Sequence, residues 1–138
     1  MEENKTTDNL QETLKPFIVE GITWHAVTLE EPQFTAYKKM ALEVMALPIL
    51  FEQEGVAVFQ FPNGTLLELY TPATVPPYGY NGAVAFGFRV NDIEAISEAL
   101  EKAGYKMLAD IVRVPEMKYA YRHFQGPDGL VYGLNEQK

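Results

Sequence analysis

The sequence predicts an α+β fold in which one order of elements, strand, helix, strand, strand, strand, occurs twice. Three observations support this prediction. With 138 residues, 47% of them hydrophobic and 12% aromatic, the chain suits one domain with a sizeable core. Strand-like runs and two segments with helical spacing follow one another along the chain. A motif built around a Pro-Asn-Gly or Pro-Asp-Gly turn also recurs.

The first module is predicted to begin after an N-terminal extension. Residues 1–20 are charged and poor in apolar side chains, so we expect them to be flexible or docked as a short helix. From Gly21, the segment GITWHAVTL alternates and predicts a half-buried strand. Apolar residues then recur at helical spacing from about Gln33 to Ala46. Strand-like runs near 48–52, 56–61 and 65–70 complete a first module, residues 21–70.

The second module follows a linker. Residues 71–82 are rich in Pro and Gly and have no periodicity, which predicts a connection. A strand over 83–90 leads to a helix from Asp92 to Ala103, with Asn91 or Asp92 as its N-cap and Gly104 after its end. Strands near 106–114, 119–125 and 130–135 complete a second module, residues 83–136. We expect the two modules to form one domain, residues 21–136.

An internal repeat links the two modules. FQFPNGTLLELY, which starts at Phe59, aligns with FQGPDGLVYGLN, which starts at Phe124, 65 positions later. HAVTLEEP, from His25, aligns with AFGFRVND, from Ala85, 60 positions later. Turns with Pro and Gly are common, but the Phe-Gln shared before both turns favours a repeat over coincidence.

These motifs carry a family resemblance. FQGPDGLVYGLNE resembles the closing strand pair, and FRVNDIEAISEALEKAGY the second-module strand and helix, of the vicinal oxygen chelate superfamily of glyoxalases, bleomycin resistance proteins and dioxygenases. The resemblance covers roughly residues 21–136. It implies two tandem βαβββ modules that form a curved mixed sheet around a cleft, with the helices on the outer face. The superfamily includes isomerases, dioxygenases, transferases and drug-sequestering proteins, so the fold alone specifies no reaction.

The resemblance also implies a metal site, which this sequence fills only in part. Metal-binding members place one ligand on the first strand and one on the last strand of each module. These positions fall on His25 and Glu68 in the first module and on Ala85 and Gly133 in the second. Alanine and glycine side chains cannot bind a metal. The departure argues against metal-dependent glyoxalase or dioxygenase chemistry.

The two turns predict the registers of their hairpins. The first places Val58 opposite Glu68, and the second places His123 opposite Gly133, so that His123 projects beside the position that glycine leaves empty. His25, Glu68 and His123 would then resemble a site for a divalent metal with two histidines and one carboxylate. A metal-free acid–base pair of His25 and Glu68 is the alternative, and the sequence leaves both open.

Tyrosines gather in the last strands of each module and in the linker. The side chains predicted to line the cleft are Tyr70, Tyr78, Tyr119, Tyr121 and Gln125. Aromatic walls with hydroxyl tips suit a small organic ligand. Trp24 neighbours His25 in the strand and is therefore predicted to face the opposite, helix-covered side. Arg122 is predicted to be a surface or edge residue, and Asp110 a solvating surface charge.

Composition excludes several classes of function. Eleven basic and nineteen acidic residues give a net charge of −8, which disfavours nucleic acid and anionic lipid as partners. Since the chain has no cysteine, disulfides, thiolate ligands and a cysteine nucleophile are excluded. The N-terminus lacks the pattern of a secretory signal and no apolar run could span a bilayer, so we expect a cytoplasmic protein without a membrane partner.

We therefore expect a small-molecule-binding protein. As an enzyme it would be a glyoxalase-like lyase or isomerase that moves a proton next to a carbonyl, with Glu68 or His25 as the base and His123 or a tyrosine polarising the oxygen. The alternative is a non-catalytic protein that sequesters an antibiotic or a metabolite, in a homodimer with shared clefts. A further alternative is that the repeat is misassigned and that the chain is another α+β domain, one used in protein contacts.

Overall fold

A computed structural model describes residues 17–138 of the chain. Most of the predicted extension, residues 1–16, lies outside the described residues. The first strand, β1 (Val19–Thr28), begins two residues earlier than predicted. It can do so because the side chain of Asn91 accepts a hydrogen bond from the backbone N–H of Ile18, at 2.6 Å. The preceding Phe17 packs against a buried hydrophobic cluster.

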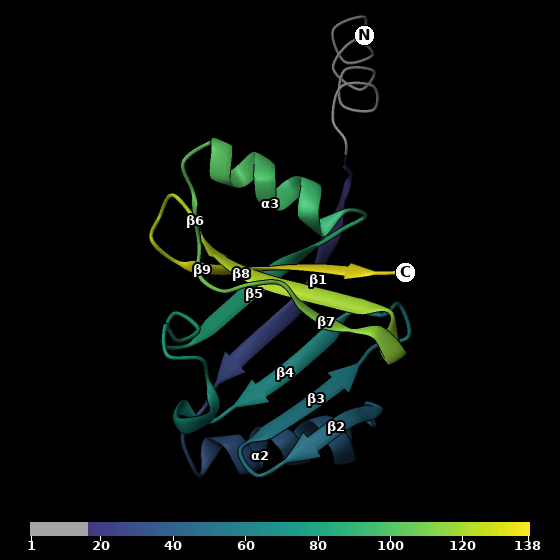
Figure 1. Ribbon diagram of the computed structural model, residues 1–138. Helices are drawn as coiled ribbons and strands as arrows, with labels where there is room; N and C mark the ends of the chain where they lie inside the picture. The colour runs from purple at the N-terminus through teal and green to yellow at the C-terminus, as the bar shows by residue number, and fades with distance from the viewer. Residues whose placement is uncertain (1–16) are drawn as a thin grey trace, which may run out of the picture.

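In the described part of the chain, nine strands form one mixed sheet that is not closed, as Figure 1 shows. Their order is β2-β3-β4-β1-β5-β9-β8-β6, and β7 pairs with β8. β1 runs parallel to β4 and β5 parallel to β9, whereas the two pairs join through antiparallel β1 and β5. The remaining strands are β2 (Ile49–Gln53), β3 (Val56–Gln60), β4 (Leu66–Tyr70), β5 (Val84–Val90), β6 (Lys106–Met107), β7 (Val112–Val114), β8 (Tyr119–Gln125) and β9 (Val131–Gln137).

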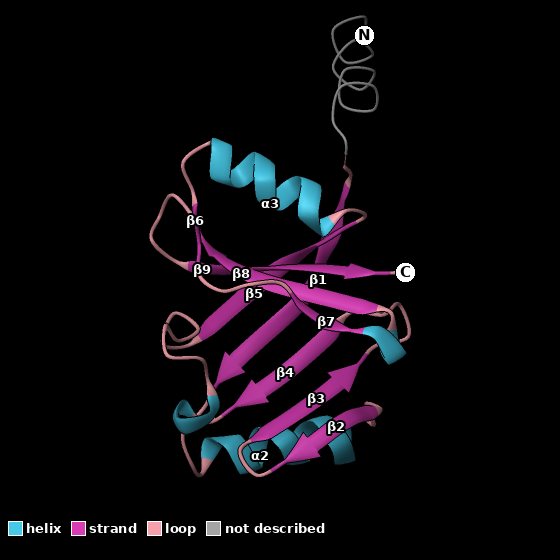
Figure 2. Cartoon of the chain, in the orientation of Figure 1, coloured by secondary structure: helices cyan, strands magenta, loops and turns pink. Residues whose placement is uncertain are grey.

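Within residues 17–138, two α-helices cover opposite ends of one face of the sheet (Figure 2). α2 (Gln33–Lys39) continues as a π-helical turn over 40–44. α3 (Ile93–Lys102) is capped by the side chain of Asp92, which accepts a hydrogen bond from the N–H of Ala95 at 3.0 Å. No helix in the described part of the chain is long and apolar enough to cross a membrane. The predicted α+β class is confirmed.

Among the residues that the structure describes, the core consists of three hydrophobic clusters. One lies between α2 and the sheet and includes Phe34, Phe59 and Leu69. A second lies between α3 and the sheet around Ile93 and Leu134. The third occupies the face without helices and contains Trp24, Ala26, Val56, Val58, Leu66, Tyr80, Ala85 and Val131. This helix-free face is where the candidate site lies.

The structure confirms both predicted hairpin registers but divides one predicted strand. Val58 pairs with Glu68, and His123 pairs with Gly133. The strand predicted over 106–114 forms two short strands, β6 and β7, which pair with opposite ends of β8. Between them the Arg122 Nε–H donates to the carbonyl of Ala109 at 2.7 Å, so a side chain takes the place of a backbone hydrogen bond.

Candidate functional site

A cavity of about 260 Å³ opens on the helix-free face of the sheet. Its aromatic lining comes from β1, β4, β8 and the connection between β4 and β5, and consists of Trp24, Tyr70, Tyr78, Tyr80, Tyr119 and Tyr121. Its polar lining consists of Glu68, Asp110, Arg122, His123 and Asn135. A concave, largely aromatic surface with a few convergent polar groups is typical of a small-molecule site.

Strand register decides which first-strand residue reaches the cavity. β1 pairs with β4 so that Ala26 faces Glu68, while His25 faces Leu67 and, on the other side, Phe86. Because neighbouring residues of a strand point to opposite faces, His25 lies on the face of the helices. The predicted association of His25 with Glu68, as metal ligands or as an acid–base pair, is wrong. The predicted position of Trp24 is wrong for the same reason, since its indole lines the cavity.

The indole ring of Trp24 lies next to Gly133, a position without a side chain. A Cβ atom added at Gly133 would lie 2.8 Å from Cε3 of Trp24, which is closer than two such atoms can approach. The indole ring lies 5.2 Å from the ring of Tyr80 in an edge-to-face arrangement and 5.3 Å from the imidazole of His123. Glycine at 133 is therefore a packing requirement of the buried tryptophan.

Glu68 is held in the cavity by its neighbours. Its Oε1 atom accepts a hydrogen bond from the hydroxyl of Tyr70 at 2.5 Å. Burial raises the pKa of Glu68 above its ordinary value of 4.5, and hydrogen bonds from Tyr70 and from the indole N–H of Trp24 oppose this effect. The result is an oriented carboxyl group that keeps its proton to a higher pH than an exposed glutamate.

His123 lies on β8 in the same cavity and is 6% exposed. Its Nδ1 atom is 2.5 Å from the hydroxyl of Tyr78. Burial lowers the pKa of His123 from 6.5 to about 4, so the imidazole is neutral at neutral pH. When Tyr78 donates to Nδ1, the ring proton is on Nε2, and this N–H can serve as a donor.

The buried neutral histidine predicts a loss of stability in acid. Because its pKa is lowered by folding, His123 favours the folded state fully above pH 6.5, and this contribution is lost as the pH falls through about 4. The difference between the two pKa values corresponds to about 3 kcal/mol. We expect urea denaturation of wild type and His123→Phe between pH 7 and pH 3.5 to show this loss in the wild type only. Parallel curves for the two proteins would contradict the buried, neutral state.

The connection between β4 and β5 contributes Tyr80 as well as Tyr78 to the cavity. Asn81, with a φ of +62°, accepts a hydrogen bond from the N–H of Val131 at 2.7 Å and donates to the carbonyl of the same residue at 3.1 Å. This clamp holds the connection against β9. Tyr80, next to Asn81, is 5% exposed and its ring lies 5.2 Å from Trp24. The sequence patterns did not assign Tyr80 to the cavity, because a linker without periodicity does not indicate which way its side chains point.

The other predicted lining residues differ in their positions. Tyr70, Tyr78, Tyr119 and Tyr121 line the cavity, and burial raises the pKa of each, so their hydroxyls stay protonated. Gln125 is exposed, and its Nε2 donates to the carbonyl of Gly129 across the turn at 3.1 Å. Its predicted place in the cleft is wrong because it lies at the hairpin end of β8. Arg122, predicted as a surface or edge residue, and Asp110, predicted as a surface charge, both line the cavity.

The metal implied by the resemblance does not fit these residues. Ala26, which faces Glu68 on β1, has no ligating atom, and neither has Ala85, its partner on β5. Gly133 is covered by Trp24. Within residues 17–138, no three His, Cys, Asp or Glu side chains are grouped so that they could hold a metal ion. The donor atoms expected from a divalent site are therefore not brought together around Glu68.

Comparisons with known proteins agree with the fold. A family model described as "Glyoxalase/Bleomycin resistance protein/Dioxygenase superfamily" matches residues 43–132. A search of curated protein sequences gave no match. Over 87% of this chain and 40% of the other, the structure is similar to the Mn(II)-bound glyoxalase from Novosphingobium aromaticivorans, with a TM-score of 0.66 and 17% identity. The chain thus spans two-fifths of the length of that protein.

Two other solved structures match over nearly their whole length. The methylmalonyl-CoA epimerase from Mycobacterium tuberculosis has a TM-score of 0.62 at 14% identity, over 93% of this chain and 95% of the other. A glyoxalase/bleomycin resistance protein/dioxygenase superfamily member from Vibrio splendidus 12B01 has a TM-score of 0.58 at 12% identity, over 87% and 100%. At such identities the similarity shows a common fold and leaves the reaction to the residues of the site.

Proposed function

Because the chain belongs to the glyoxalase/bleomycin resistance protein/dioxygenase superfamily, we propose that its aromatic cavity binds a small carbonyl compound and moves a proton on the carbon next to the carbonyl. One observation carries this proposal: a buried carboxyl group with a raised pKa, Glu68, and a neutral imidazole, His123, line the same cavity. Pairs of titratable groups whose environments move their pKa values in useful directions are a mark of acid–base sites.

Glu68 is the base in this proposal. A carboxylate with a raised pKa is a stronger base than an ordinary glutamate once it has lost its proton. The hydrogen bond from Tyr70 fixes the direction of one carboxylate oxygen. Glu68 takes a proton from the substrate carbon, exchanges it with the solvent, and returns a proton either to that carbon or to its neighbour. The product is a stereoisomer or a positional isomer, and no other atom is transferred.

His123 stabilises the oxygen of the intermediate. Removal of the proton places negative charge on the carbonyl oxygen, and donors arranged in advance around that oxygen lower the barrier. With Nδ1 bonded to Tyr78, the Nε2–H of His123 is available to donate to it. The tyrosines of the wall, which burial keeps protonated, add further donors. No metal takes part in the proposed reaction, in agreement with the donor set around Glu68.

The pairing of the strands supports a cavity that is built from two modules. We infer that the parallel pairs β1–β4 and β5–β9 correspond to each other in two tandem βαβββ modules. Glu68 then comes from the last strand of the first module and His123 from the second module. Each module supplies one of the two acid–base groups.

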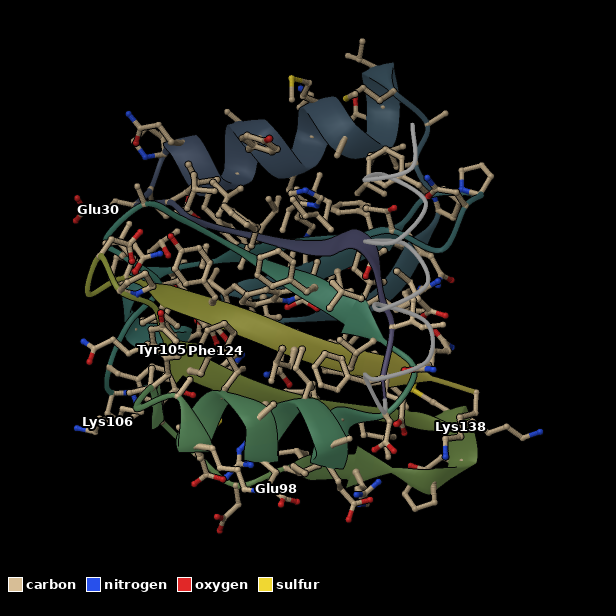
Figure 3. All side chains as sticks on the ribbon, turned by 90° about the horizontal axis from the view of Figure 1, so that it is seen from above. Glu30, Glu98, Tyr105, Lys106, Phe124 and Lys138 are labelled. Carbon is tan, nitrogen blue, oxygen red and sulfur yellow. The ribbon has the colours of Figure 1, made fainter. Side chains whose placement is uncertain are left out.

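Proton exchange tests the proposal directly. We expect the wild-type protein, incubated in D₂O with a panel of small aldehydes and ketones, to speed deuterium incorporation next to the carbonyl of at least one of them, as followed by ¹H NMR. Glu68→Gln should slow the exchange about a hundredfold, because an amide cannot act as the base. Glu98→Gln, an equal loss of charge on the outer surface of α3, should have no effect (Figure 3).

A sequestering protein is the second candidate, and two hydrogen bonds to Glu68 favour it. The hydrogen bonds from Tyr70 and Trp24 lower the pKa of the carboxyl group and so weaken it as a base. Stabilisation of the wild type by a ligand in a thermal-shift measurement, without exchange or product formation, would support sequestration and contradict the catalytic proposal. Absence of both would show that the cavity does not bind this class of compound.

A further inference from the structure

The aromatic rings of the cavity form one continuous wall. Tyr80 lies at its centre, with its ring centroid 5.2 Å from Trp24, 5.3 Å from Tyr70 and 5.4 Å from His123. Tyr121 extends the wall, with its ring centroid 5.8 Å from that of His123. The faces of tryptophan and tyrosine rings carry partial negative charge, and several such rings around one space attract an organic cation.

Glu68 adds a negative charge to this wall when its carboxyl group is ionised. Its charge contributes to the raised pKa values of four cavity tyrosines, so it is within electrostatic reach of all of them: Tyr70, Tyr80, Tyr119 and Tyr121. A buried carboxylate is unfavourable unless it is paired with a positive group. In the part of the chain that the structure describes, no lysine or arginine forms an ion pair with Glu68.

The positive groups near the cavity are directed elsewhere. Arg122 donates its Nε–H to the carbonyl of Ala109, and the cavity lining also contains the opposite charge of Asp110. Arg89, whose charge reaches Tyr119, directs its Nη2 atom to the carbonyl of Gly64 at 3.4 Å. The imidazole of His123 is neutral at neutral pH. A net charge of −8 on the chain also draws cations toward the protein.

We propose that the cavity recognises an organic ammonium group, which lies against the rings of Trp24, Tyr80 and Tyr121 with Glu68 as its counter-charge. A volume of about 260 Å³ suits a small amine. The proposal deepens the proposed function by naming the substrate class, a carbonyl compound with a positively charged nitrogen, and it rests on that function only for the location of the ligand. The ammonium charge would also favour the ionised form of Glu68, which is the form that acts as a base.

Two probes of equal shape and different charge test this inference. Choline has a trimethylammonium group, and 3,3-dimethyl-1-butanol has an uncharged tert-butyl group in its place. We expect isothermal titration calorimetry at pH 7.5 to show about tenfold tighter binding of choline to the wild-type protein, because only the charged group interacts with the ring faces and the carboxylate. Raising the ionic strength should weaken the binding of choline and leave that of the alcohol unchanged.

Variants of the protein show which residues recognise the charge of choline. Glu68→Gln and Tyr80→Leu should each remove most of the preference for choline, whereas Glu98→Gln should keep it. Since Tyr80 is buried and its loss can disturb folding, Tyr121→Leu, at a half-buried position, provides a second test of the ring faces. Near-ultraviolet circular dichroism of each variant checks that the aromatic packing is retained. Tyr121→Phe, which preserves the ring, should bind choline as the wild type does.

The outcomes separate this inference from the proposed function. Equal affinity for the two probes, no binding of either, or a preference for choline that survives both Glu68→Gln and Tyr121→Leu would each overturn the ammonium site. A preference for choline that depends on these residues would support it even if no carbonyl compound exchanges its proton. Proton exchange on uncharged ketones without any preference for choline would support the proposed function alone.

Discussion

Replacing Trp24 with alanine is expected to lower the free energy of unfolding by about 3–5 kcal/mol, the usual cost of removing a large buried aromatic side chain. Trp24 is 5% exposed, and its ring packs against Tyr80, His123 and Gly133. The loss of its indole N–H also leaves the carboxyl group of Glu68 with one hydrogen bond fewer. Urea denaturation followed by circular dichroism, which does not depend on tryptophan fluorescence, measures the change.

A double-mutant cycle with Gly133 distinguishes specific packing from general loss of core. Gly133→Ala alone should destabilise the protein by about 1–3 kcal/mol, because its Cβ would lie 2.8 Å from the Trp24 ring. In the Trp24→Ala background the same methyl group enters vacated space, so the second substitution should cost little or be favourable. Strictly additive effects would contradict the contact between the two residues.

The hairpins were the part of the site that the sequence predicted best. Each register depends on a turn of three residues, Pro-Asn-Gly or Pro-Asp-Gly, which joins the two strands directly and so determines their pairing. For this reason Glu68 and His123 were assigned to the correct partners, Val58 and Gly133. The local geometry of each turn and its two strands was sufficient to predict these pairings.

The pairing of β1 with β4 could not be predicted from a turn in this way. The two strands are parallel and are separated by α2 and by β2 and β3, so no turn determines how they align. An alternating strand allows either face to be turned toward the cavity. The resemblance favoured His25, and the register selects its neighbour Trp24 instead. A sequence signal for the correct choice was nevertheless present, since Gly133, two strands away in the same sheet, is the small residue that the large ring of Trp24 requires.

The pairing of β1 with β5 also contains an irregularity, which interrupts the regular alternation of side chains along the strand. The register shifts between Ile22 and Trp24, so Thr23 is an extra residue in β1. The Thr23 hydroxyl lies 3.3 Å from Oδ1 of Asn135, a cavity residue. Neighbours in sequence, Thr23 and Trp24, thus both reach the same side of the sheet. A bulge of this kind has no signature in the segment GITWHAVTL.

Gly87→Ala is expected to have a second large effect, a destabilisation of about 3 kcal/mol or more. A Cβ atom at this position would lie 2.8 Å from three backbone atoms of Gly133 on β9. Backbone in the middle of a sheet cannot move aside as the end of a flexible side chain can, so β9 has to separate from β5. Val84→Ala, in the same strand but 52% exposed, should change the stability by less than about 0.5 kcal/mol.

The position of Gly87 links the stability of the sheet to the cavity. A shift of β9 that relieves the contact at Gly87 also moves Gly133, and with it the surface on which Trp24 lies. We therefore expect Gly87→Ala to weaken the binding of choline in the calorimetric measurement, although residue 87 does not line the cavity. If the variant lost the predicted stability but bound choline with wild-type affinity, the clash would be relieved elsewhere, and Trp24 would be positioned independently of the β5–β9 pairing.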